Sequence, residues 1–103
     1  MRFLKELYVG EGIKNKKKII WKLKHGVGML DIYVISLSNG SDQLECMKCV
    51  YFKQKAIRDQ VGIIVGLARG YSEAQSLMVT MIEEAFLETG SANVKEYLIN
   101  NKK

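Results

Sequence analysis

The segment from Val61 to Gly90 contains two different patterns of hydrophobic positions. Residues 61–68 are apolar on both alternating faces, which is typical of a central strand covered on both sides. From Tyr71 to Thr89 the apolar residues recur at helical spacing, and Gly90 is well placed to end that helix. The segment therefore predicts an interior strand followed by a long helix that is the main cover of the sheet.

The predicted helix is apolar over more of its surface than one sheet would bury. Val79 and Phe86 lie beside the main apolar stripe, so we expect a second element to cover the helix. Residues from Ser91 to about Asn100 predict a short terminal helix for this role, with Ser91 as its cap. The last residues, 100–103, are expected to fray.

In residues 16–24, KKKIIWKLK, every second position from Ile19 to Leu23 is apolar. In a strand, Ile19, Trp21 and Leu23 would share an apolar face, with most of the lysines on the other face. Residues 25–28, HGVG, have the composition of a hairpin connection, and Leu30–Ser38 is rich in β-branched residues. The pattern predicts a Lys-rich β-hairpin with Trp21 in the core, followed by a turn at Asn39–Asp42.

Two stretches fit more than one structure. Met1–Val9 is compatible with a short strand or with a single helical turn. Gln43–Gln60 fits both strand and helix spacing, and the apolar positions favour a short strand at Gln43–Cys46 followed by a helix over roughly Met47–Asp59.

Together these elements predict an α+β fold. The 103 residues suit a single domain. We expect a small antiparallel β-sheet of three or four strands, with two or three helices mainly on one face.

Composition indicates an ordinary globular protein, with 48% hydrophobic and 26% charged residues. The longest apolar runs fall far short of a membrane span, and the first residues lack the apolar core of a signal peptide. With two cysteines and no export signal, the chain is expected to be cytoplasmic with free thiols.

A resemblance covers most of the chain. The motifs that carry it are Val65-Gly66-Leu67-Ala68, Gly70-Tyr71-x-Glu73-Ala74, Glu83-Glu84, Glu88-Thr89-Gly90, Val94 with Tyr97-Leu98, Ile19-Ile20-Trp21-Lys22 and Ile32-Tyr33-Val34-Ile35. In these the chain resembles a family of short bacterial proteins of unknown function. The resemblance implies the strand and helix described above and no activity.

Charge is concentrated near the N-terminus. Residues 1–30 carry eight basic and two acidic residues, whereas residues 61–103 carry four basic and five acidic ones. The basic pole consists of Lys14, Lys16, Lys17, Lys18, Lys22, Lys24 and His25. It predicts contact with an acidic partner, either nucleic acid or protein, and its alternative is a solvated surface whose lysines serve solubility.

The turn before the long helix is a second candidate. Arg69, Gly70, Tyr71 and Ser72 lie where backbone N–H groups and a helix N-terminus can bind an anion. The spacing matches neither of the glycine-rich phosphate-loop patterns. The alternative is that the glycine only shapes the turn, and Gly70 and Ser72 are alternative caps of the helix.

Cys46 and Cys49 form a CxxC motif at a predicted strand-to-helix junction, where thiol–disulfide enzymes keep their attacking thiolate. Thiol-redox proteins of that type place a cis-proline opposite the motif, and this chain has no proline. A zinc site needs four ligands, and Cys46, Cys49 and His25 are too few. No metal or cofactor is therefore predicted.

The sequence thus favours a small non-catalytic binding or assembly module over an enzyme. Its basic hairpin is the predicted contact with an acidic partner, and a thiol-redox protein using Cys46 and Cys49 is the alternative. A homo-oligomer built on the apolar surface around Val79 and Phe86 is a third hypothesis.

Overall fold

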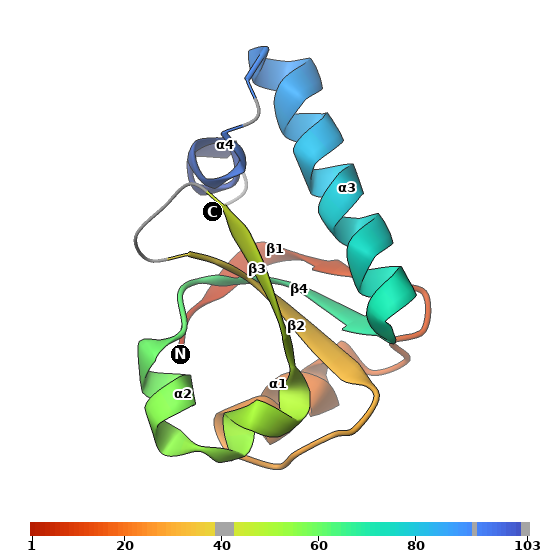
Figure 1. Cartoon of the computed structure of the whole chain (residues 1–103), viewed down its shortest axis with the longest axis vertical. Coiled ribbons are helices and arrows are strands. Elements are labelled where there is room, and N and C mark those ends of the chain that lie inside the picture. Colours follow the sequence, from red (N-terminus) through yellow and green to blue (C-terminus); the bar gives the residue numbers. More distant parts are fainter. Residues whose placement is uncertain (39–42, 92, 102–103) are drawn as a thin grey trace.

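The computed structural model describes residues 1–38, 43–91 and 93–101. Its strands are β1 (Phe3–Val9), β2 (Ile32–Leu37), β3 (Leu44–Lys48) and β4 (Ile64–Arg69). Its helices are α1 (Lys16–Lys24), α2 (Lys55–Gln60), α3 (Tyr71–Thr89) and α4 (Val94–Asn101), and a short 3₁₀ helix, η1 (Cys49–Lys53), precedes α2 (Figure 1). The predicted turn at Asn39–Asp42 lies outside the described residues.

The four strands form one sheet in the order β1-β4-β2-β3. β2 runs antiparallel to both β3 and β4, whereas β1 runs parallel to β4. The α+β class, the strand number and the interior position of β4 are therefore confirmed. The sheet is mixed rather than wholly antiparallel, because β1 forms a strand and lies along β4 in the same direction.

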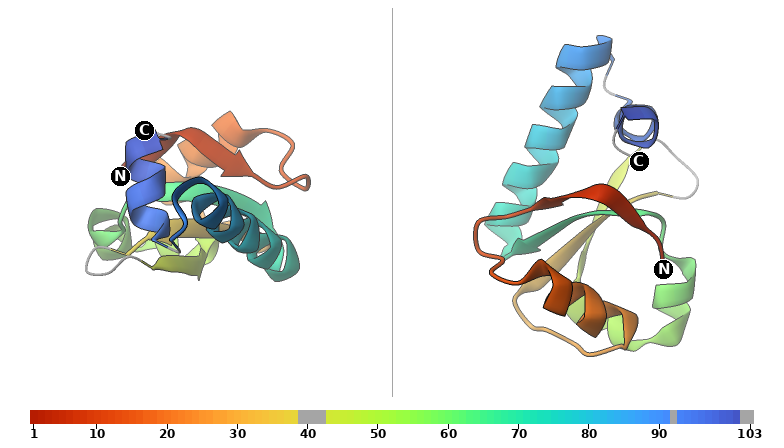
Figure 2. Two further views of the ribbon diagram at one scale, coloured as in Figure 1. Left: turned by 90° about the horizontal axis from the view of Figure 1, so that it is seen from above. Right: turned by 180° about the vertical axis from the view of Figure 1, so that it is seen from behind.

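Helices cover both faces of the sheet, which corrects the expectation of helices mainly on one face. In Figures 1 and 2, α3 and α4 lie on one side of the strands, and α1 and α2 lie on the other. β4 explains this arrangement, because Val65 and Ala68 belong to the core shared with α3 and α4, while Ile64 and Leu67 belong to the core shared with α1 and η1. A strand apolar on both faces requires cover on both.

Residues 16–24 form an α-helix, so the prediction of a β-hairpin there was wrong. The Asn15 side chain accepts a hydrogen bond from the Lys18 N–H at 3.1 Å, which caps the helix. At the other end Gly26, with φ of +70°, closes a Schellman motif in which Val27 N–H donates to Lys22 O at 2.9 Å. The alternating pattern was misleading because Ile19 and Leu23, four residues apart, share one face in a helix as well.

Residues 43–60 combine both of the structures that the sequence allowed. The predicted strand at Gln43–Cys46 is present as β3, which extends to Lys48. The predicted helix over Met47–Asp59 is instead two short helices, η1 and α2, which are separated at Gln54.

The long helix has the predicted bounds, and Gly90 ends it in the left-handed conformation. Its cap residue is Gly70 rather than Ser72. α4 packs against α3 as expected, but it begins after Asn93, whose side chain accepts from Glu96 N–H at 3.0 Å. Of the expected fraying segment, residues 102–103 lie outside the described residues.

The apolar sector of α3 is only partly covered. α4 contributes Val94, Tyr97 and Leu98 to the core that contains Met81 and Ala85 of α3. Val79 and Phe86, which we expected a second element to cover, are 52% and 58% exposed. The apolar width of the helix therefore exceeds what the sheet and α4 bury.

Candidate functional site

The residues of the predicted basic pole lie on and around α1. Ile19 and Leu23 are buried against the sheet, which turns the remaining faces of the helix toward solvent. Of the predicted basic pole, Lys22 is half-buried and the other members are exposed. Lys14 precedes the helix, His25 follows it, and the remaining members, Lys16, Lys17, Lys18, Lys22 and Lys24, lie along it.

Trp21 lies on the solvent side of this helix, which corrects the prediction that it belongs to the core. Its side chain is 56% exposed. The ring stacks on the imidazole of His25, with ring centroids 4.1 Å apart and planes inclined by 22°. His25 Nδ1 lies 2.7 Å from Trp21 O, and because a carbonyl only accepts, Nδ1 carries the donated proton. The two rings form a fixed aromatic surface.

Three lysines lie one helical turn from Trp21. Lys17 and Lys18 lie one turn before Trp21 and Lys24 lies one turn after it, so all three are its neighbours on the helix surface. The ammonium of Lys24 also lies 5.5 Å from the centroid of the Phe3 ring on β1, in a cation–π contact. The arrangement is an exposed aromatic pair with lysines one turn before and one turn after Trp21 on the same helix.

On the flank of α1 that faces the ends of β2 and β4, the surface is hollowed into a pocket of about 330 Å³. Three lysines and one arginine line it together with Asp31 and an apolar wall. The lining residues are Lys14, Asn15, Lys18, Ile19, Lys22, Met29, Asp31, Ile32 and Arg69. The pocket thus unites Arg69 with three members of the basic pole, which the sequence had offered as separate candidates.

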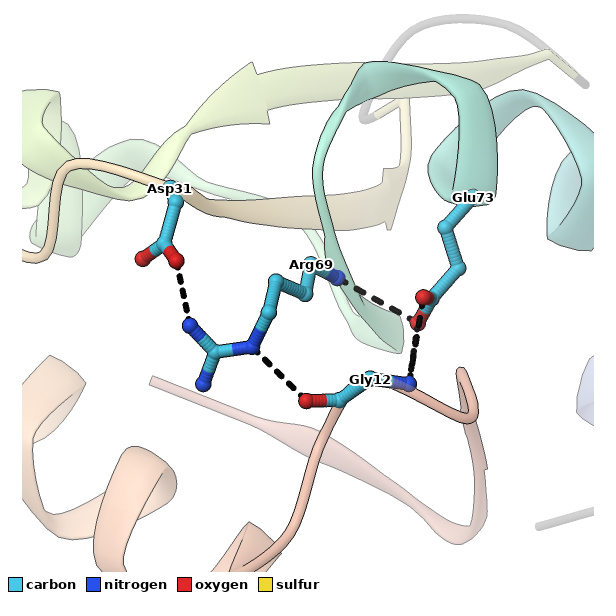
Figure 3. Close-up of polar contacts among 4 residues, drawn as sticks. All are labelled: Gly12, Asp31, Arg69 and Glu73. Atoms are coloured by element: carbon cyan, nitrogen blue, oxygen red, sulfur yellow. Dashed lines mark hydrogen bonds and ion pairs between the residues drawn. The ribbon is translucent and has the colours of Figure 1, made fainter.

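Arg69 is held in this position by a polar network (Figure 3). Its Nε donates to Gly12 O at 2.7 Å and its Nη1 forms an ion pair with the Asp31 carboxylate. The Glu73 carboxylate accepts from the backbone N–H groups of Gly12, at 3.1 Å, and of Arg69, at 3.3 Å. The network ties the loop after β1, the end of β4 and the start of α3 together around the arginine.

The other residues of the predicted anion-binding turn do not converge with Arg69 on one point. Gly70 N–H donates to Asp31 O at 2.8 Å, and the ring of Tyr71 packs near that of Tyr33, 5.7 Å between centroids. Ser72 is exposed. The Glu73 carboxylate accepts from the Arg69 N–H, so an internal anion already lies beside the backbone of this turn.

Cys46 and Cys49 lie on opposite faces of the sheet. Cys46 on β3 packs against the core beneath α3 and α4, whereas Cys49 is buried in the core beneath α1. Burial raises the pKa of both thiols. Side chains three residues apart on an extended chain point in opposite directions. This geometry gives no support to a pair of thiols that cycles between the reduced form and a disulfide.

Within residues 1–38, 43–91 and 93–101, no three His, Cys, Asp or Glu side chains gather where a metal ion would bind. In the same part of the chain no helix is both long and apolar enough to cross a membrane.

Comparison of the chain with protein-family models, with curated proteins and with solved structures finds no match in any of the three.

Trp21 is the functional candidate that the sequence interpretation misplaced. Two local signals would have found it, namely Asn15 as a helix cap and Gly26 as the residue after the last turn. Together they define a helix whose buried stripe is Ile19 and Leu23, and they leave the tryptophan outside.

Proposed function

We propose that the chain binds single-stranded nucleic acid along α1. The observation that carries the proposal is the exposed Trp21 ring, which stacks on His25 and has lysines one turn away on the same helix. Proteins that bind single strands combine a positive surface along the phosphates with aromatic side chains on which bases stack. The proposed partner is an acidic molecule, as the sequence predicted, but a helix presents the basic pole instead of a hairpin.

The aromatic pair favours nucleic acid over an acidic protein as the partner. Acidic side chains need only cations, whereas an unpaired base also has a face that stacks on an aromatic ring. It favours a single strand over a duplex because the bases of a duplex are already stacked on one another. The role is non-catalytic, and we place it in the cytoplasm, where Cys46 and Cys49 stay reduced.

Intrinsic fluorescence tests the proposal directly, because Trp21 is the single tryptophan of the chain. Titration with a labelled 12-nucleotide single strand should quench the tryptophan and raise the anisotropy of the label with the same midpoint. Trp21→Ala should weaken binding by about 1–3 kcal/mol, or roughly 5- to 150-fold.

Phe86→Ala is the matched control. Phe86 is 58% exposed, close to the value for Trp21, and it lies on α3 across the sheet from α1. Its removal should leave strand binding unchanged when both proteins are titrated at a concentration at which each is monomeric by sedimentation. Equal losses from both variants, or binding without quenching, would refute the assignment of the site to α1.

We also propose that α3 mediates self-association. Val79, Ile82 and Phe86 are spaced at i, i+3 and i+7 and are 52%, 41% and 58% exposed, so they form one apolar stripe. A stripe on one helix can pair with the same stripe of a second copy about a two-fold axis. Sedimentation should give a dimer at high protein concentration, and Phe86→Glu should give a monomer; a monomeric wild-type chain would contradict the proposal.

A further inference from the structure

The pocket beside α1 has the charge of an anion site. Lys14, Lys18, Lys22 and Arg69 supply four positive charges and Asp31 supplies one negative charge. Because Asp31 is paired with Arg69, its carboxylate is partly neutralised, and the three lysines remain in excess. A ligand with two negative charges matches this excess better than one with a single charge.

The size of the pocket suits one small group. Its volume of about 330 Å³ is near the lower end of the range for ligand pockets. It therefore holds a single phosphate with its sugar more readily than a run of nucleotides. Its apolar wall, made by Ile19, Met29 and Ile32, can take the less polar face of that sugar or of a base.

Arg69 is preorganised for this role. Gly12 O and the Asp31 carboxylate hold its guanidinium, and Glu73 holds its backbone N–H. An arginine fixed in this way loses little conformational freedom when a ligand arrives, while the lysines can adjust around the ligand.

We propose that this pocket binds a phosphomonoester dianion, the terminal phosphate of a nucleic-acid strand or the phosphate of a free nucleotide. A phosphomonoester carries nearly two negative charges at pH 7, whereas an internal phosphodiester carries one. Lys18 lines the pocket and lies one turn from Trp21, so the pocket continues the surface on which bases stack. The strand-end form of the inference rests on the proposed function, and the nucleotide form stands without it.

The experiment compares one 12-nucleotide sequence with a 5′-phosphate, with a 3′-phosphate and with hydroxyls at both ends. Adenosine monophosphate is titrated alone and as a competitor. One of the phosphorylated strands should bind about tenfold tighter than the hydroxyl strand, since the extra charge makes charge-assisted hydrogen bonds. Lys22→Gln should remove this preference, and Lys17→Gln, a lysine outside the pocket lining, should weaken all three strands alike and keep it.

The outcomes distinguish a strand end from a free nucleotide as the ligand, and they distinguish the pocket from strand binding along α1. A preference for a phosphorylated end with weak binding of adenosine monophosphate assigns the pocket to strand ends. Tight binding of adenosine monophosphate that Lys22→Gln abolishes assigns it to a free nucleotide, even when no strand binds and the proposed function fails. Equal binding of all three strands, together with no binding of the monophosphate, overturns the pocket and leaves binding along α1 standing.

Discussion

Salt dependence measures how many lysines of α1 contact phosphates. Lys17, Lys18 and Lys24 are the helix neighbours of Trp21, so a strand stacked on that ring would meet about three cations. For single strands the logarithm of the binding constant falls with the logarithm of salt with a slope of about −0.7 for each phosphate neutralised. Three contacts give a slope of about −2, or roughly a 20-fold loss of affinity between 50 and 200 mM salt.

The double substitution Lys17→Gln with Lys18→Gln should leave one contact. The slope should then be about −0.7, and affinity should fall only about threefold over the same range of salt. Glutamine has nearly the helix propensity of lysine, so α1 should persist, and circular dichroism checks this. Fluorescence titration at four salt concentrations gives the slopes.

A second double variant distinguishes the loss of contacts on α1 from the loss of net charge. Lys48→Gln with Lys53→Gln removes the same charge from exposed positions on β3 and η1, and its slope should equal that of the wild-type chain. Equal slopes for both double variants, or a wild-type slope near zero, would refute phosphate contacts on α1.

Three further predictions concern the rest of the fold. Because burial raises the pKa of Cys46 and Cys49, both thiols should alkylate slowly at pH 7, and mass spectrometry after mild oxidation should find no disulfide between them. The pKa of Tyr8 is raised mainly by burial and then by the hydrogen bond from its hydroxyl to Glu84. The contribution of Tyr8 to the free energy of unfolding is therefore complete below about pH 10 and is lost as the pH rises through the raised pKa. Tyr8→Phe should lessen the loss of stability at alkaline pH that urea unfolding measures. In Gly66→Ala the new methyl group would lie 2.8 Å from the flexible end of Met81, and a cost of about 1 kcal/mol in urea unfolding is expected, whereas a gain in stability would contradict this packing.

Local patterns predicted the secondary structure correctly where the hydrophobic positions fitted only one kind of element. The helix from Tyr71 to Thr89 holds its period over five turns and has its predicted bounds. The strand predicted over residues 61–68 is present as β4, which begins three residues later and ends at Arg69. Residues 16–24 are short, and their alternation also satisfies one side of a helix. For this segment the two ends indicate a helix, because Asn15 caps its first turn and Gly26 follows its last turn with a positive φ.

The position of Cys49 shows a limit of motif spacing. CxxC indicates a redox pair when both thiols lie in the first turn of an α-helix. Here Cys46 is part of β3, and strand alternation sends the two side chains to opposite cores. The same two residues at the same spacing thus have a different chemistry because the backbone between them is extended.

The pattern of residues along the chain was sufficient to predict the α+β class, an interior strand that is apolar on both faces, and the excess of positive charge near the N-terminus. The parallel pairing of β1 with β4 and the packing of helices on both faces of the sheet were not predictable from it and are seen in the folded chain. The tertiary structure alone placed Arg69 beside Lys14, Lys18 and Lys22. Periodicity reports contacts within a few residues, whereas this pocket depends on packing between segments that are about 50 residues apart along the chain.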